Sequence, residues 1–218
     1  MDVGSMTMDE LRAALAPLVA QEAAFDGWSL TAVDQAAITL GIAPATARVL
    51  FPGGAMDMID AWIGATDRAM IAALPAEELA ALPIRERIRR MVEFRLDHIA
   101  PGREALRRAL AIMADPRHAL RSLQLGWRSA DAMWRLAGDT ATDFNHYSKR
   151  TTLAAIYAAT LAVFADDKSE GFADTRAFLN RRIAGVMRFE KAKARLLRPA
   201  DEHFSPARLL GRLRYPAR

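Results

Sequence analysis

Apolar residues recur at helical spacing along most of this chain, and that periodicity limits the folds open to it. From Met8 to Phe25, for example, Leu11, Leu15 and Leu18 fall on one stripe of an amphipathic helix. Hydrophobic residues make up 52% of the chain, but β-branched residues are sparse and the period of two that marks half-buried strands is missing. The sequence therefore predicts an all-α globular protein.

Proline and glycine residues divide the periodic segments into about nine or ten helices. We expect them at residues 8–25, 31–40, 44–50, 56–74, 84–99, 102–113, 116–136, 148–165 and 171–197, with a short last helix at 206–214. A chain of 218 residues can form one large domain, or a small domain and a larger one. The predicted division has a helix-turn-helix subdomain at 1–74, a helical domain with room for a ligand at 75–200 and a basic amphipathic segment at 201–218.

The first subdomain has the layout of a helix-turn-helix. Thr31 is the expected N-cap of the first short helix, with Asp34 three residues further on. Gly41 is expected to end that helix, and Pro44 suits the first position of the next one. Two helices joined by a tight glycine turn form this motif, and the spacing over residues 11–63 resembles the N-terminal domain of TetR-type transcription regulators.

The charge distribution argues against DNA as the partner of this subdomain. Residues 1–84 carry three Lys or Arg against eleven Asp or Glu, whereas residues 176–218 carry twelve against three. The second helix of such motifs enters the major groove, and here it offers only Arg48 as a cation for the phosphates that dominate affinity. We therefore expect a packing module. A DNA-binding transcription regulator that senses an apolar ligand is the alternative.

The sequence contains no visible catalytic constellation. Cysteine is absent, which excludes disulfides, thiol catalysis and thiolate metal sites. The histidines form no helical metal-ligand pair; they are His98, His118, His146 and His203. Asp143-x-x-His146 is half of a metal site without a second half, and Asp166-Asp167 suits a solvated helix end. Phosphate-binding and nucleophile-elbow motifs are also missing, so we expect no enzyme activity, no metal and no cofactor.

The segment 148–165 is apolar nearly all round, which is typical of a core helix. Its many alanines leave volume that neighbouring side chains or a ligand could fill. The candidate pocket residues on this segment and on the preceding helix are Leu120, Leu123, Trp127, Met133, Leu153, Ile156, Tyr157, Leu161 and Phe164. An ordinary well-packed core is the alternative interpretation.

The C-terminal segment mixes leucines with arginines in a pattern that suits an anionic membrane surface. The residues concerned are Arg208, Leu209, Leu210, Arg212 and Leu213. A docked terminal helix with a solvated charged face is the alternative. The longest apolar run, 153–165, is too short to span a bilayer, and the acidic N-terminus lacks the features of a targeting segment. We therefore expect a cytoplasmic protein that associates peripherally with a membrane.

The connection Ala137–Arg150 is chemically richer than a simple helix connection needs to be. It carries two acids, an amide, an imidazole, a phenol and two cations, and interaction residues concentrate on such loops. Together with the stretches 133–139, 153–157 and 174–182, it resembles the accessory-protein family of ubiquinone (coenzyme Q) biosynthesis. The resemblance is strongest over about 120–190.

The resemblance implies a TetR-like all-α fold, usually dimeric, with an isoprenoid quinone or a phospholipid bound in an apolar pocket. It also implies a non-catalytic role, in which the protein assists the demethoxyubiquinone hydroxylase at a membrane that its C-terminal helix contacts. The hydroxylase-docking residues carried over are Trp134, Asp139, Asp143, Asn145, His146, Tyr147, Lys149 and Arg150. His146 stands where the family's mitochondrial members commonly carry Trp, and the lack of a targeting segment fits a bacterial-type member.

Overall fold

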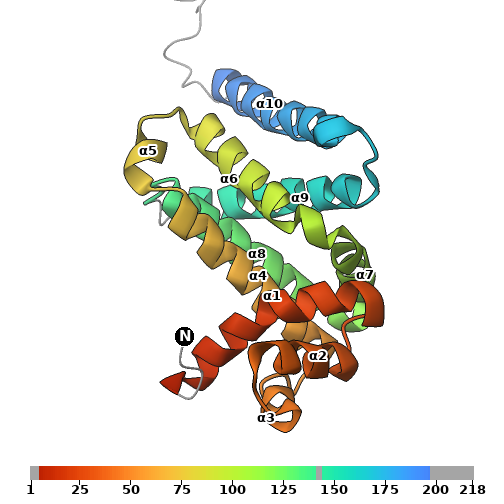
Figure 1. Ribbon diagram of the computed structural model, residues 1–218. Helices are drawn as coiled ribbons and strands as arrows, with labels where there is room; N and C mark the ends of the chain where they lie inside the picture. Colours follow the sequence, from red (N-terminus) through yellow and green to blue (C-terminus); the bar gives the residue numbers. More distant parts are fainter. Residues whose placement is uncertain (1–4, 141–143, 197–218) are drawn as a thin grey trace, which may run out of the picture. The chain divides into compact units, whose positions relative to one another are not determined.

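The computed structural model describes residues 5–140 and 144–196, and every regular element in these ranges is a helix (Figure 1). The α-helices are α1 (Met8–Asp26), α2 (Leu30–Leu40), α3 (Pro44–Val49), α4 (Ala55–Ala73), α5 (Ala76–Ala80), α6 (Ile84–Ile99), α7 (Arg103–Met113), α8 (Ala119–Leu136), α9 (Phe144–Asp166) and α10 (Ala173–Leu196). Short 3-10 turns precede α7, α8 and α10 at Ala100–Gly102, Pro116–His118 and Glu170–Phe172. The all-α prediction is confirmed.

The chain packs as two compact units, residues 1–180 and residues 181–218. The first unit contains α1 to α9 and the start of α10, and the described part of the second is the continuation of α10 to Leu196. Within the first unit, α4 packs against α1 as well as against α6 and α8. The predicted boundaries after residues 74 and 200 stay predictions, and the predicted membrane segment 201–218 lies outside the described residues.

Capping chemistry sets the ends of α2. Gly41 ends this helix as predicted, since it adopts the left-handed conformation with φ of 79°. The predicted N-cap, Thr31, is wrong: the Ser29 hydroxyl accepts a hydrogen bond from the Ala32 N–H at 3.3 Å. Serine and threonine cap helices by the same chemistry, so a serine two residues earlier starts the helix sooner.

The start of α9 also differs from the prediction. The helix begins at Phe144 rather than at Ser148, so Asn145, His146 and Tyr147 lie in its first turn instead of in a loop. The first turn of a helix can be polar and exposed because the protein covers only part of it. Such a turn has the composition of a connection, and composition alone therefore placed the boundary too late.

In the interior of the first unit, α1 packs against α2 and α4. Their side chains Leu15, Val19, Val33 and Ile59 are completely buried. A tryptophan joins this group to the rest of the unit. Trp28 lies between α1 and α2, and its indole N–H donates to the carbonyl oxygen of Ala105 on α7 at 3.0 Å. The helix-turn-helix is therefore anchored to the helices that follow it.

The prediction that the segment 148–165, which lies within α9, is a core helix is wrong in part. Its side chains Leu153, Tyr157 and Phe164 are buried, but alanines such as Ala155 and Ala159 are exposed. Alanine favours helix without requiring burial, so an alanine-rich face does not have to be a core face. Among the residues that the structure describes, every helix is too short or too polar to cross a bilayer.

The link between α9 and α10 depends on one carboxylate, Asp167. Its two oxygens accept hydrogen bonds from the N–H and hydroxyl groups of Ser169 and Thr175, at 2.5 to 2.9 Å. Burial raises the pKa of Asp167, but these hydrogen bonds outweigh burial and hold the pKa well below its ordinary value. The charged form is therefore the one that the fold stabilises.

We predict that Asp167→Ala lowers the free energy of unfolding at pH 7 by about 1–2 kcal/mol, because the hydrogen-bond donors of Ser169 and Thr175 lose their acceptor. The native pKa lies below the unfolded value of about 3.9, so this contribution is present above that pH and shrinks as the pH falls below it. Urea unfolding at pH 7 and at pH 3 measures both effects. Asp166→Ala, which removes an exposed neighbour, is the matched control; an equal loss in both variants would contradict the prediction.

Candidate functional site

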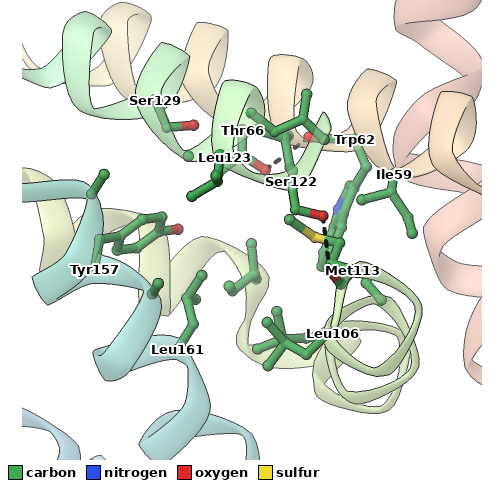
Figure 2. Close-up of a pocket in the computed structure, with 18 of the residues that line it drawn as sticks. Ile59, Trp62, Thr66, Leu106, Met113, Ser122, Leu123, Ser129, Tyr157 and Leu161 are labelled. Atoms are coloured by element: carbon green, nitrogen blue, oxygen red, sulfur yellow. Dashed lines mark hydrogen bonds between the residues drawn. The ribbon is translucent and has the colours of Figure 1, made fainter. Parts of the chain in front are cut away.

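A cavity of about 470 Å³ lies within the first unit, between α4, α6, α7, α8 and α9 (Figure 2). Its walls are mostly apolar. The bulky side chains that line it include Ile59, Trp62, Ile99, Leu106 and Met113. Sites for small organic molecules have volumes of roughly 300–1,000 Å³ and predominantly apolar walls, so both the size and the lining suit a hydrophobic ligand.

Three of the predicted pocket residues line this cavity: Leu123, Tyr157 and Leu161. Leu123 projects into the cavity (Figure 2), and 72% of its surface is exposed. Because the same side chain reaches both the cavity and the solvent, the cavity opens to the surface beside Leu123.

The other predicted pocket residues lie outside the lining. Met133, Leu153 and Phe164 are buried in the packing between helices, Ile156 and Trp127 are partly exposed, and Leu120 is exposed. The contributions from α4, α6 and α7 were not predicted. The periodicity of those helices indicates which side faces inward, but it does not indicate whether that side meets another helix or a cavity.

A buried polar cluster interrupts the apolar wall. Arg95 on α6 is only 2% exposed and forms an ion pair with Asp67 on α4. Its second terminal nitrogen donates to the Ser129 hydroxyl on α8 at 3.3 Å, and Ser129 donates to the other oxygen of Asp67 at 3.3 Å. The guanidinium also lies 4.8 Å from the centre of the Tyr157 ring. Four helices therefore meet at one charged side chain.

Burial lowers the pKa of Arg95, but its interactions with Tyr157 and Asp67 outweigh burial and raise that pKa, so the guanidinium stays charged. This cluster was not predicted from the sequence, although the sequence contains one indication of it. Ile88, Val92, Arg95 and Ile99 follow the spacing of a buried stripe. An arginine on the apolar face of a helix indicates a buried charge that needs a partner.

The predicted docking residues divide into a buried part and an exposed part. Arg150, only 1% exposed, bridges Asp131 at 2.6 Å and Asp139 at 2.9 Å. Lys149 also contacts Asp139, at 2.6 Å, and its ammonium lies 5.4 Å from the centre of the Trp134 ring. These contacts tie the first turns of α9 to the end of α8.

Burial raises the pKa of Asp139, but hydrogen bonds from Lys149 and Arg150 outweigh burial and lower that pKa. Trp134 adds a further connection, because its indole N–H donates to the carbonyl oxygen of Lys149 at 3.0 Å. Arg150 and Asp139 therefore position the surrounding backbone, and Arg150 itself offers almost no surface to a partner.

The exposed part is an aromatic cluster on the surface of α8 and α9. The Tyr147 ring is centred 6.0 Å from Trp127 and 5.2 Å from His146. Tyr147 is 60% exposed, and Asn145 beside it is exposed as well. Exposed tyrosine and tryptophan rings are common anchors of protein interfaces. Of the predicted docking residues, Asp143 lies outside the described residues.

Comparison with known proteins indicates the family to which the chain is related. A family model described as COQ9 matches residues 119–190. The chain is 34% identical over 168 residues to the mitochondrial ubiquinone biosynthesis protein COQ9 of Homo sapiens. The aligned region covers 74% of this chain and 52% of the human protein. The corresponding protein of Drosophila melanogaster is 26% identical over 187 residues, covering 84% of this chain and 57% of the relative. The chain belongs to the COQ9 family.

This member of the COQ9 family spans about half the length of the curated relatives it matches. The family match covers α8 and α9, which carry the aromatic cluster and one side of the pocket. A solved TetR transcriptional regulator from Nitrosomonas europaea matches 82% of this chain and 98% of its own chain, with a TM-score of 0.63 and 23% sequence identity. That similarity shows a TetR-like fold.

In this COQ9-family chain the only cation of α3 is already paired. Arg48 donates from Nε to Asp34 on α2 at 2.7 Å, and a second nitrogen contacts the same carboxylate at 2.5 Å. The hydrogen bonds from Arg48 hold the pKa of Asp34 below its ordinary value. Between residues 5 and 196, leaving out 141–143, the structure brings together no three histidine or acidic side chains that could hold a metal ion.

Proposed function

We propose that this chain is a non-catalytic, lipid-binding accessory protein of ubiquinone biosynthesis. In this proposal the cavity holds an isoprenoid quinone intermediate or a phospholipid, and the demethoxyubiquinone hydroxylase docks on the surface around Tyr147. One observation carries the proposal: a homologue of ubiquinone biosynthesis protein COQ9 has an open apolar cavity of about 470 Å³. Ubiquinone precursors are themselves largely apolar, so a protein that binds them needs an apolar cavity.

The walls of the cavity support a lipid more than a polar metabolite. Trp62, Leu106, Met113 and Leu161 supply aromatic and aliphatic surface, and methionine adapts readily to flexible apolar groups. The opening beside Leu123 would let a chain longer than the cavity extend to the protein surface. A prenyl or acyl tail has this elongated shape.

The surface around Tyr147 supports a protein partner. Its exposed aromatic rings rest on a framework of buried ion pairs at Asp139 and Arg150, so a partner would meet side chains that are already held in place. Pre-ordered side chains lose less conformational entropy on binding. His146 contributes a smaller ring here than the Trp expected from mitochondrial members.

A DNA-binding regulator is the weaker candidate. The pairing of Arg48 with Asp34 uses the cation that α3 would offer to a phosphate, and the surrounding subdomain is acidic. The likeness to a TetR regulator concerns the fold, which hosts functions other than transcription. The homodimer implied by the family resemblance stays a prediction.

Filling the cavity should reduce its lipid content. Ala154→Phe places a ring inside the lining, so we expect at least a roughly tenfold loss of isoprenoid quinone or phospholipid recovered with the purified protein. Solvent extraction followed by mass spectrometry measures the bound lipid. Ala155→Phe adds the same ring at the next, exposed position of α9 and should leave lipid content unchanged. Protein that is empty of lipid before either substitution would contradict the proposal.

Removing the exposed ring should weaken docking without unfolding the protein. Tyr147→Ala should reduce affinity for the hydroxylase by tenfold or more, the effect expected of a central aromatic anchor, with unchanged thermal unfolding. Titration of the purified hydroxylase by surface plasmon resonance measures this. Arg135→Ala, at an exposed position near the end of α8, is the control and should bind normally. Full retention of binding by Tyr147→Ala would move the docking site elsewhere.

Membrane association is proposed for the segment 206–218. Its arginines would meet lipid phosphates while its leucines enter the headgroup boundary. A chain ending at residue 205 should therefore float far less with vesicles that contain phosphatidylserine, and it should behave like the full chain with uncharged vesicles. Equal flotation of the two chains with anionic vesicles would refute this assignment.

A further inference from the structure

A second hollow, of about 420 Å³, lies on a different side of α4 from the apolar cavity, where α4 runs alongside α1 and α8 (Figure 1). We call it the polar hollow, because charged side chains from all three helices line it. On α4 these include Asp60, Asp67 and Arg68, which follow the spacing of one helix face. The two linings share no residue in the described part of the chain, so the polar hollow is a separate site.

One carboxylate of the polar hollow, that of Asp60, contacts three arginines. Its oxygens lie 2.6 Å from Arg128, 3.6 Å from Arg121 and 3.8 Å from Arg12. Arg121 also pairs with Asp57. Among the described residues, however, Arg12 and Arg128 form ion pairs with Asp60 alone. Because one carboxylate neutralises only one positive charge, these two arginines leave the hollow with positive charge in excess.

Arg68 adds a third cation to the lining. Its side chain is exposed and forms no ion pair within residues 5–140 and 144–196. Gly64, one turn earlier on α4, has no side chain to separate it from α8. A β-carbon at Gly64 would lie 3.5 Å from one terminal nitrogen of Arg68 and 3.9 Å from one of Arg128. Two guanidinium groups from different helices therefore converge on the space beside Gly64.

The acidic side chains of the polar hollow do not cancel this charge. Asp67 is already paired with the buried Arg95. The remaining acids of the lining are Asp60, which the arginines share, and Asp9, which is exposed in the first turn of α1 and forms no ion pair with a described residue. The three lining arginines outnumber these two acids, so the site favours an anion.

We propose that the polar hollow binds a phosphate group, held beside Gly64 between Arg68 and Arg128 while Arg12 adds positive charge. A guanidinium carries five N–H donors in a planar fork and accepts no hydrogen bond. Phosphate supplies several acceptor oxygens and matches that fork with two parallel hydrogen bonds. Soluble phosphate esters and phospholipid head groups share this chemistry, and the experiment separates them. The site lies outside the lipid cavity, so this inference does not depend on the proposed function.

Titration of the full chain with inorganic phosphate tests the site. The backbone N–H signal of Gly64 is followed by NMR, with ionic strength held constant by sodium chloride. We expect this signal to shift and to saturate as phosphate replaces chloride, because phosphate can bridge two guanidinium groups. A signal that does not respond, or a shift that never saturates, would overturn the proposal.

Removing one of the two converging cations should weaken phosphate binding. Arg68→Ala should lower the affinity about tenfold, the effect of losing a charge-assisted hydrogen bond, and should leave thermal unfolding unchanged because the side chain is exposed. Arg90→Ala is the matched control, since Arg90 on α6 is also exposed and forms no ion pair with a described residue. An equal loss in both variants would overturn the proposal, because the binding would then follow net charge.

Removing the unpaired acid should have the opposite effect. Asp9→Asn takes away a negative charge that faces the polar hollow, so the affinity for inorganic phosphate should rise about threefold. A weaker or unchanged affinity would contradict the placement of phosphate in this hollow.

Two further probes identify the carrier of the phosphate. Glycerol 3-phosphate represents a soluble ester, and vesicles that contain phosphatidate represent a lipid head group. For a soluble ester, Arg68→Ala should bind glycerol 3-phosphate about tenfold more weakly and float with the vesicles like Arg90→Ala. For a head group, Arg68→Ala should instead float less than Arg90→Ala. Either result supports a phosphate site, whereas normal behaviour of Arg68→Ala with both probes would refute it.

Discussion

The ion pair between Arg95 and Asp67 is the interaction on which the first unit most depends. It joins α6 to α4, and through Ser129 and Tyr157 it reaches α8 and α9, helices that lie far apart in the sequence. Removing a charge from water is costly unless a close partner offsets the loss. The four helices can therefore bury Arg95 only in the arrangement that brings these partners together, and that arrangement also leaves the cavity between them.

A second buried arginine, Arg150, stabilises the region that carries the proposed docking surface. Arg150 and its carboxylate partners Asp131 and Asp139 hold the start of α9 against the end of α8. Tyr147 and Trp127 remain at the surface of this framework. The polar stretch between the two helices thus contains residues that position the backbone and residues that a partner can touch. The two kinds lie close together in the sequence, and the structure distinguishes them by their exposure.

Much of the fold could be predicted because helix periodicity and capping are local properties. The stripe of Leu11, Leu15 and Leu18 and the stop at Gly41 need no knowledge of the rest of the chain. The cavity could be predicted only in part. Leu123 and Tyr157 lie on the segments that the sequence singled out, but Trp62 and Leu106 come from helices whose inward faces gave no sign of a void. Side-chain exposure was the least predictable property. Arg150, for example, was expected to contact a partner but is buried.

The sequence by itself determined that this chain is helical, that its N-terminal third is acidic, and that α8 and α9 carry the residues by which its family is known. The tertiary structure decided which of those residues face a cavity, which face solvent and which are enclosed with a charged partner. The physical reason is that helix formation and net charge depend on neighbours along the chain. A cavity or a buried ion pair exists only where segments distant in sequence meet, as Asp67, Arg95 and Ser129 do.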